Sequence, residues 1–414
     1  MKEKYLKLAL PSGFECIIGV LITMTDTFMI SKLGSGVIAS VGAMGTVIDF
    51  MYLILQAINV SNNVMVARTL GKNDFERIKI TTGTSLIIAI FCSFLCIGVT
   101  LTISGFLPAL FKIDNIGLIY LYIRLAGVLP NTILTILSGY QRALGNSKRM
   151  LNVRIFCFIT NAILDFILVT MGFNVMGVAI ATVMVEVLNM LILIFYCRKN
   201  VKLSYDKDIA KEQISLIKYN AYERVFKRGS TFIMNIIMSR IGAIAYAAHL
   251  VVMQFLDLIN NFLHGTGIGT QTMVATALGS ENKQETKSIV QGIKKINKKM
   301  IYIITLCIGI SMLFLLPVFL LEKESLDIAY KLIIFVLIDC VLSGFYHYYS
   351  SVLRAMKEFK YISKLSFYIS VVLKLLLMFI LANIWNIYGV WLCFLISDII
   401  MDIYLNKPIR KLLS

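Results

Sequence analysis

Apolar residues run along this chain in long segments that recur from one end to the other, with polar residues clustered between them. Each segment is about twenty residues long, which is the length that a helix needs to cross a hydrocarbon core of roughly 30 Å. The pattern predicts an all-α membrane protein with twelve spanning helices. We place them at residues 10–31, 44–66, 80–104, 117–140, 152–172, 175–196, 230–249, 252–274, 300–321, 327–350, 361–384 and 386–405.

The two halves of the chain resemble each other at a spacing of about 208 to 212 residues. The clearest matches are NVMVARTLGKND at 63–74 with QTMVATALGSEN at 271–282, and QRALGN at 141–146 with LRAMKE at 353–358. A repeat with an even number of spans predicts two six-helix lobes that run in the same direction, related by an axis along the membrane normal. We therefore expect an N-terminal lobe at 1–196, a basic cytoplasmic linker at 197–229, a C-terminal lobe at 230–414 and a central cleft between the lobes.

Composition agrees with a membrane protein. The chain is 58% hydrophobic and 15% charged, with a mean hydropathy of +0.82. In soluble domains about half of the residues are apolar and about a quarter are charged. The formal charge of +17 is concentrated in alternate loops. By the positive-inside rule, we expect these loops and both termini to face the cytoplasm. We expect the protein to lie in the plasma (inner) membrane.

Three function classes lose support from the residue pattern. A nucleic-acid surface would need its basic residues on one solvated face with aromatics between them, and contact with anionic lipid headgroups explains the basic loops sufficiently. The eight cysteines are scattered without a CxxC pair, and the three histidines lie away from them, so no metal-ligand spacing is present. A phosphate-cradling GxxxxGK[ST] motif is also missing. We expect neither an enzyme nor a cofactor.

Polar residues inside the spans are the candidates for function, since a charge there costs roughly 2.5 to 3.5 kcal/mol. Asn161 and Asp165 are one helical turn apart and share a face. Asp26 lies fifteen residues past Pro11, about 22 Å into its span at 1.5 Å per residue, and Asp165 lies at a similar depth. Thr182 reaches the same level from the opposite side. Two carboxylates, an amide and a hydroxyl suit H⁺ or Na⁺, and all four residues are the metal ligands if the ion is Na⁺.

The sequence also allows other roles for the polar residues inside the spans. Asp26 and Asp165 could be unrelated packing acids, each satisfied by a neighbouring hydroxyl. Glu186, one turn beyond Thr182, is a candidate accessory proton carrier. Asp49 and Asp257 are repeat partners and could either contact substrate or form structural hydrogen bonds.

The second half does not repeat the four-residue cluster. It instead has Lys374 near the middle of a span, with Asp398 on the next one. A lone buried ammonium is costly, so we expect an ion pair between them.

Several stretches resemble the multidrug and toxic compound extrusion (MATE) family: LALPSGFECIIGVLITMTDTFMISKLG at 8–34, VMVARTLGKND at 64–74, LSGYQRALGNSKRMLNVRIFCFITNAILDFIL at 137–168, and AIAYAAHL with GTGIGTQTMVATALGSEN in the second half. The resemblance implies a twelve-helix secondary antiporter that exports cationic or amphipathic small molecules in exchange for H⁺ or Na⁺. It resembles most the DinF-like type, in which the coupling site lies in the N-terminal lobe. We expect a monomer.

The family pattern also implies residue roles and shows departures. The acid of the first helix matches Asp26, the coupling residues of the fifth and sixth match Asn161, Asp165 and Thr182, and the bending proline matches Pro11. The seventh helix lacks the acid found in another branch, and Asp339 lies about one turn from the tenth-helix acid.

The seventh helix also looks short, because Gly229 to Gly242 spans 13 residues where Pro11 to Gly34 spans 23. This shortness keeps a non-transporting scaffold or immunity protein as an alternative. A flippase for lipid-linked oligosaccharides, from the wider superfamily that the resemblance implies, is another alternative; it would need a strongly basic central cavity, and Lys374 is the one hint of that.

Overall fold

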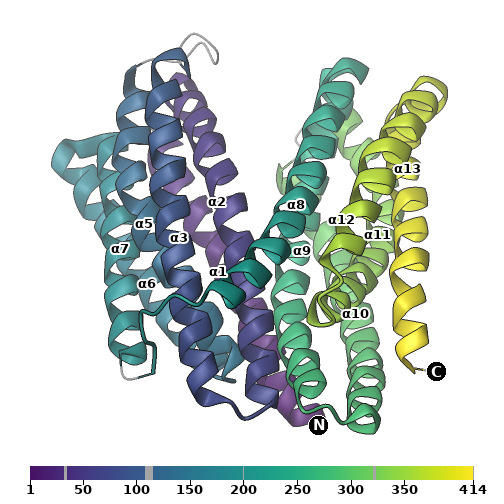
Figure 1. The fold of residues 1–414 in the computed structure, drawn as a ribbon. Helices are drawn as coiled ribbons and strands as arrows, with labels where there is room; N and C mark the ends of the chain where they lie inside the picture. The colour runs from purple at the N-terminus through teal and green to yellow at the C-terminus, as the bar shows by residue number, and fades with distance from the viewer. Residues whose placement is uncertain (32–34, 108–114, 199, 320–322, 414) are drawn as a thin grey trace. The chain divides into compact units, whose positions relative to one another are not determined.

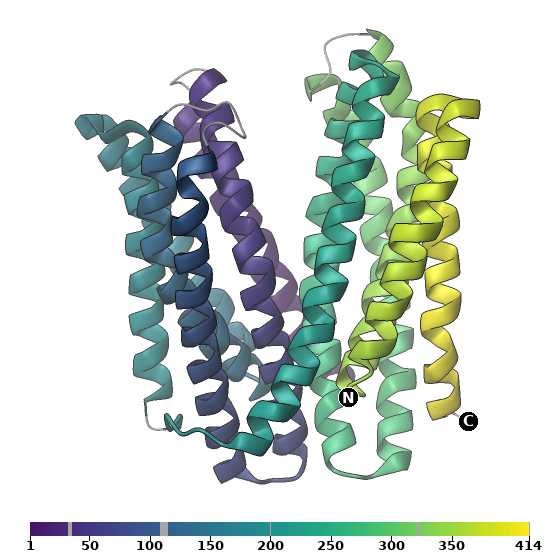
Figure 2. The same ribbon diagram turned by 45° about the horizontal axis from the view of Figure 1, so that its top comes forward.

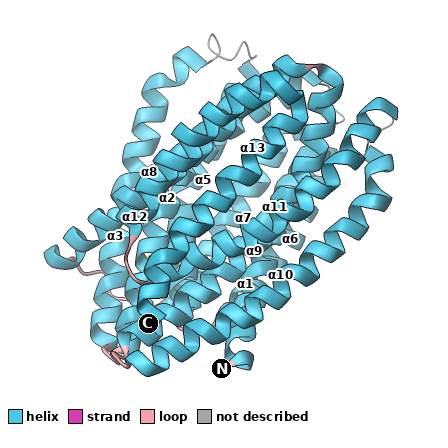
Figure 3. Ribbon diagram, turned by 90° about the vertical axis from the view of Figure 1, so that its right-hand side faces the viewer, coloured by secondary structure: helices cyan, strands magenta, loops and turns pink. Residues whose placement is uncertain are grey.

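The computed structural model describes residues 1–414 except 32–34, 108–114, 199, 320–322 and 414. This part is almost entirely helical and contains no β-strand (Figure 3). A helix satisfies its backbone N–H and C=O groups within its own segment, as a hydrocarbon environment requires. The predicted all-α membrane fold is confirmed.

Eight helical stretches in the described residues are long and apolar enough to cross a membrane. Two of them, 147–197 and 359–413, have 51 and 55 residues, and each reverses direction within its length. The first turns at Gly172, which has a φ of 92°, and the second at Trp385 and Asn386, with φ of −126° and 51°. Each of these two stretches therefore supplies two spans. Helices α8 and α9, outside the eight stretches, complete the twelve.

Residues 14–221 form one compact unit. It contains most of α1 (Lys2–Ser31), then α2 (Ser35–Gly71), α3 (Phe75–Ile103), η1 (Ser104–Phe106), α5 (Asn115–Ala143), α6 (Ser147–Leu168), η2 (Val169–Phe173) and α7 (Asn174–Cys197) (Figure 1). Helix α5 packs against both α2 and α7, and α6 packs against α7. These contacts bring the polar residues of four helices into one interior.

Residues 222–414, together with residues 1–13, form the other unit. It contains the end of α8 (Lys207–Ile241), then α9 (Ala243–Gly279), α10 (Lys283–Phe319), α11 (Lys323–Ala355), α12 (Phe359–Leu365), η3 (Ser366–Leu373) and α13 (Lys374–Leu413). Helix α11 packs against α9, α10 and α13, and a cluster of buried apolar side chains that includes Met238, Met312 and Trp391 fills its core.

The turns of the two halves repeat as the sequence does. Three pairs of residues with positive φ have the spacing of the sequence repeat: Asn73 (58°) with Glu281 (60°), Gly145 (90°) with Lys357 (67°), and Asn174 (48°) with Asn386 (51°). The following caps repeat too, since Asp74 Oδ1 accepts from Arg77 N–H at 3.0 Å and Asn282 Oδ1 from Glu285 N–H at 3.1 Å. The internal repeat is thus present in the backbone as well as in the sequence.

The predicted boundary between the seventh and eighth spans is wrong. Helix α8 is a single helix of 35 residues, drawn in teal in Figure 2, and α9 begins directly after Gly242, whose φ is 146°. The predicted span at 230–249 therefore joins the end of one helix to the start of the next, and the predicted span at 252–274 begins too late. The seventh helix is not short. Gly34, used in the comparison of lengths, lies outside the described residues.

A buried acid in α8 explains why hydropathy missed this helix. Glu223 Oε1 accepts hydrogen bonds from Arg354 at 2.7 Å and from the Tyr346 hydroxyl at 2.8 Å. Its side chain is only 3% exposed. Burial in this ion pair neutralises charges that a hydropathy average counts as exposed. The seventh helix does contain an acid, contrary to the sequence prediction.

The lobe boundaries also differ from the predicted ones. Residues 207–229, assigned to the linker, are helical and continue into the rest of α8. The first thirteen residues group with the C-terminal half because α1 packs closely on α9: a Cβ added at Gly265 would lie 2.6 Å from Gly13 Cα, and one added at Gly269 would lie 2.7 Å from Ala9 Cα. Tyr5 Oη and Thr270 Oγ1 are 3.1 Å apart nearby.

Replacing Gly265 with Ala is expected to lower thermal stability. The added methyl group would press on backbone atoms of α1, which cannot move aside as a flexible side chain can, and overpacking of this kind costs about 1–3 kcal/mol. Gly98→Ala in α3 is the matched control, because a Cβ there meets no atom within 4 Å. Thermal unfolding of the purified proteins measures the difference. Equal melting temperatures for the two variants would contradict the close approach of α1 and α9.

Candidate functional site

Two carboxyl groups from different helices share one amide in the N-terminal half. Asn161 Nδ2 donates to Asp26 Oδ1 at 3.0 Å and to Asp165 Oδ2 at 2.6 Å. Asp26 comes from α1, whereas Asn161 and Asp165 come from adjacent turns of α6. The two carboxyl groups are also within hydrogen-bonding contact of each other. Asp26 and Asp165 therefore lie together and are not the unrelated packing acids of the alternative interpretation.

Thr182 of α7 completes this group, which we call the acid cluster: Asp26, Asn161, Asp165 and Thr182. Thr182 Oγ1 lies 3.3 Å from Asp26 Oδ2 and 2.9 Å from the Val178 carbonyl oxygen, so its hydroxyl can donate to either. Asn161 and Asp165 are 1% and 0% exposed. Asn161 Oδ1 and Asp165 Oδ1 are buried and receive no N–H or O–H donor in the described residues. Two buried oxygen atoms are therefore available to a cation.

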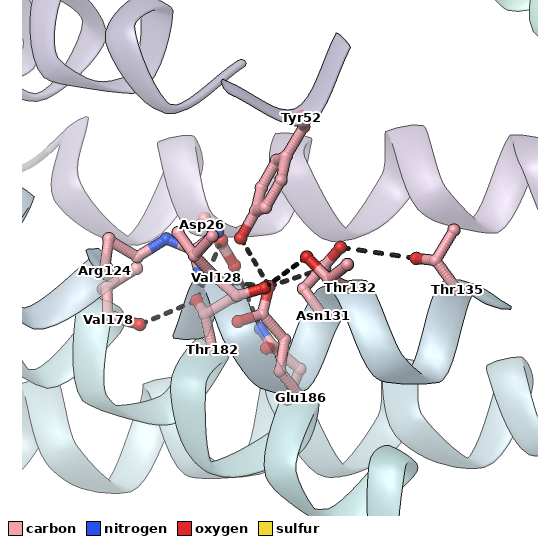
Figure 4. A network of polar contacts seen from close by, with 11 residues as sticks. Asp26, Tyr52, Arg124, Val128, Asn131, Thr132, Thr135, Val178, Thr182 and Glu186 are labelled. Carbon is pink, nitrogen blue, oxygen red and sulfur yellow. Dashed lines mark hydrogen bonds and ion pairs between the residues drawn. The ribbon is translucent and has the colours of Figure 1, made fainter. Parts of the chain in front are cut away.

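A second polar group surrounds Glu186, one turn beyond Thr182 on α7 (Figure 4). Glu186 Oε1 accepts from Asn131 Nδ2 at 2.9 Å and from the Tyr52 hydroxyl at 3.4 Å. It also forms an ion pair with Arg124 Nη1 at 3.4 Å. Gly127 makes room for this carboxylate, since a side chain at that position would collide with Glu186 Oε2. Glu186 is thus next to the acid cluster and held by partners from α2 and α5.

Arg124 is the residue that sequence reasoning missed. It lies within the predicted span 117–140, is only 8% exposed and interacts electrostatically with both Glu186 and Asp26. Its Nε atom has no hydrogen-bond acceptor in the described residues. The sequence does show a basic residue inside a span, and such a residue is a candidate for function on the same grounds as an acid there. The interior of this half therefore contains a fixed cation beside three acids.

The other candidate residues are not members of the acid cluster. Asp49 of α2 and Asp257 of α9 are both exposed, and neither joins the hydrogen bonds described above. Asp49 lies near Tyr120, and Asp257 interacts electrostatically with Arg228. Pro11 lies inside α1, and the helix continues through it. Their proposed roles stay predictions.

Lys374 and Asp398 both line one cavity in the C-terminal unit. No ion pair joins them in the described residues. The Lys374 ammonium instead lies over the Phe394 ring, 3.7 Å from its centroid. A cation above an aromatic face is stabilised by the negative charge density of the ring. The ammonium of Lys374 is therefore in contact with the Phe394 ring and not, as expected, in an ion pair with Asp398.

These features define a class of protein: a multi-pass membrane transporter built from two six-helix halves, with a buried polar cluster inside one of them. The MatE family model matches residues 11–167 and 221–401. The chain therefore belongs to the MATE family of multidrug efflux transporters, as the sequence resemblance implied, and its members are transporters rather than enzymes.

Named relatives and solved structures agree with this assignment. A relative from Thermotoga maritima, "Probable multidrug resistance protein NorM", is 24% identical over 309 residues, covering 70% of this chain and 66% of its own length. The chain thus matches just under two thirds of that relative. A protein of the same name from Haemophilus ducreyi is 24% identical over 159 residues, covering 37% of this chain and 34% of its own length.

Solved structures share the whole fold. A MATE protein crystallised in complex with MaD3S has a TM-score of 0.90 at 18% identity, covering 99% of this chain and 96% of its own. A MOP superfamily transporter from Pyrococcus furiosus has a TM-score of 0.88 at 18% identity, covering 100% of this chain and 97% of its own. At this identity the likeness establishes the fold alone: twelve transmembrane helices in two lobes.

Proposed function

We propose that the protein is a secondary active antiporter that exports cationic or amphipathic small molecules in exchange for H⁺ or Na⁺ by alternating access. The observation that carries the proposal is that Asp26 and Asp165 share the amide of Asn161, with Asn161 and Asp165 themselves buried. Loading this cluster with a cation changes its net charge, and unloading restores it. A cation that binds the inward- and outward-facing states unequally can shift the equilibrium between them.

The free oxygens of the cluster favour H⁺ over Na⁺. Asn161 and Thr182 already direct donors at the carboxylates, which leaves Asn161 Oδ1 and Asp165 Oδ1 as acceptors. A hard metal cation needs several oxygen ligands at once, whereas a proton needs one. The nearby Arg124 also supplies a permanent positive charge, which lowers the need for a metal cation. No further cofactor is proposed.

Transport by the purified protein in liposomes tests this function. A pH gradient and a Na⁺ gradient are imposed separately, and the movement of a fluorescent cationic dye is followed. We expect the pH gradient to drive dye export and the Na⁺ gradient alone to have little effect. Dye movement driven only by Na⁺ would reverse the choice of ion, and no movement with either gradient would contradict antiport.

The same experiment separates the alternatives. A flippase for lipid-linked oligosaccharides would not move the dye, and a non-transporting scaffold would move nothing. The length of α8 removes the reason for considering a scaffold, since the seventh helix is complete. We further propose that the protein acts as a monomer in the plasma (inner) membrane with both termini in the cytoplasm. The basic loops support the cytoplasmic position of the termini.

A further inference from the structure

The C-terminal unit contains a cavity of about 250 Å³ whose lining carries charges of both signs. Lys227 and Lys374 provide the positive charges, and Asp339 and Asp398 the negative ones. Trp391 and Phe394 form part of its apolar wall. Pockets for drug-sized ligands usually have about 300–1,000 Å³. The volume therefore fits a molecule smaller than a typical drug.

Lys374 interacts electrostatically with Asp339 across the cavity but forms no direct ion pair in the described residues. Lys227 lies 3.7 Å from Glu223 and donates to the Tyr346 hydroxyl, whereas Lys374 has no ion pair in the described residues. The Phe394 ring lies against its ammonium group, 3.7 Å away at the centroid. The Lys374 ammonium is half-buried and lines the cavity without a carboxylate in ion-pair contact, so an anionic group in the cavity would give it a direct partner. Lys374 thus offers a site for a carboxylate or similar anion.

One acceptor and one donor in the cavity lining also have no partner in the described residues. Asp339 is 5% exposed, it lies in hydrogen-bonding contact with Asp398, and its Oδ1 receives no donor in the described residues. Trp391 is 1% exposed, and its Nε1–H has no acceptor there. Buried polar groups of this kind normally have partners. A ligand amine would satisfy Asp339, and a ligand acceptor would satisfy Trp391.

We propose that this cavity binds small aromatic zwitterions, with the ligand anion at Lys374, the ligand amine at Asp339 and Asp398, and the ring against Trp391 and Phe394. A purely cationic ligand leaves Lys374 unpaired and adds a like charge beside it. A purely anionic ligand leaves the acidic wall unsatisfied. The proposal is independent of cation coupling in the N-terminal half, because it concerns equilibrium binding in the other unit.

A matched set of probes tests the charge pattern: phenylalanine, phenethylamine and 3-phenylpropionate have the same ring and differ in charged groups. The chain has two tryptophans, so Trp385→Phe leaves Trp391, in the cavity wall, as the only indole reporter. Each probe is titrated into this full-length protein in detergent at neutral pH without any gradient, and the fluorescence of Trp391 is recorded. We expect phenylalanine to bind most tightly of the three.

Single replacements assign the charged groups. Lys374→Met should weaken phenylalanine binding by about tenfold or more, since it removes a charged hydrogen bond. Asp339→Asn should weaken phenylalanine and phenethylamine but not 3-phenylpropionate. Lys331→Met, an exposed lysine on α11, is the control and should bind normally. Thermal unfolding confirms that each variant is folded.

Three results would overturn the proposal: phenethylamine binding most tightly, unchanged phenylalanine affinity in Lys374→Met, or no saturable fluorescence response to any probe. None of them bears on the liposome experiment, which measures gradient-driven export rather than equilibrium binding. The failure of either proposal can therefore be recognised separately.

Discussion

Asp165→Asn is expected to reduce gradient-driven export to the level of liposomes without protein. Asparagine has nearly the same shape as aspartate and can still accept a hydrogen bond from Asn161, so the helices should keep their places. It cannot gain and lose a proton, and it brings no negative charge to a metal cation. The acid cluster would then keep nearly the same geometry while losing a group that changes charge during the cycle.

The measurement is dye export from proteoliposomes under an imposed pH gradient, with equal amounts of folded protein in each preparation. Asp327→Asn is the matched control, because it makes the same chemical change at an exposed position near the start of α11. The control should export at the normal rate. Full gradient-driven export by Asp165→Asn would show that coupling resides elsewhere, even though the fold is correct.

Arg124→Met is expected to have the largest effect on stability. Glu186 would lose the cation that lies 3.4 Å from its carboxylate, and both side chains are only 10% exposed. Removing one partner of a buried ion pair typically costs about 3–5 kcal/mol, because the remaining charge is left uncompensated. Arg77→Met, an exposed arginine at the start of α3, should have little effect.

A double-mutant cycle isolates this pair. Adding Glu186→Gln to Arg124→Met removes the stranded charge, so the double variant should be more stable than Arg124→Met alone. Glu186→Gln by itself should cost less than Arg124→Met, since Arg124 keeps Asp26 nearby. Melting temperatures of the four proteins measure the coupling. If the effects of the two replacements were simply additive, the ion pair would contribute nothing of its own.

Much of the fold could be predicted from hydropathy and internal repetition. The reversals at Gly172 and at Trp385 and Asn386 fall where apolar segments were separated in the sequence. The prediction went wrong at α8, where Glu223 and the basic residues around it lowered the hydropathy of a helix whose charges are partly paired inside the protein. A sequence average cannot recognise that two charges separated by more than a hundred residues neutralise each other.

The candidate site was only partly predictable for a related reason. The spacing of Asn161 and Asp165 placed them on one face of a helix, and depth estimates brought Asp26 and Thr182 to the same level. Depth does not determine direction, and only the packing of α1, α6 and α7 shows that these side chains meet. The contacts of Arg124 with Glu186 and of Lys374 with Phe394 could not be predicted from the sequence, because they depend on how neighbouring spans pack.

The sequence by itself determined that the protein is a membrane-spanning bundle of two similar halves, since apolar length and repetition act locally along the chain. It also limited the polar residues that could serve a function inside the membrane. Only the tertiary structure decided which of them are partners: Asp26 with Asp165, Glu186 with Arg124, and Lys374 with Phe394. These contacts join residues on separate helices or, for Lys374 and Phe394, on opposite sides of the turn inside α13. Their geometry depends on how the spans rotate and pack, which no local pattern records.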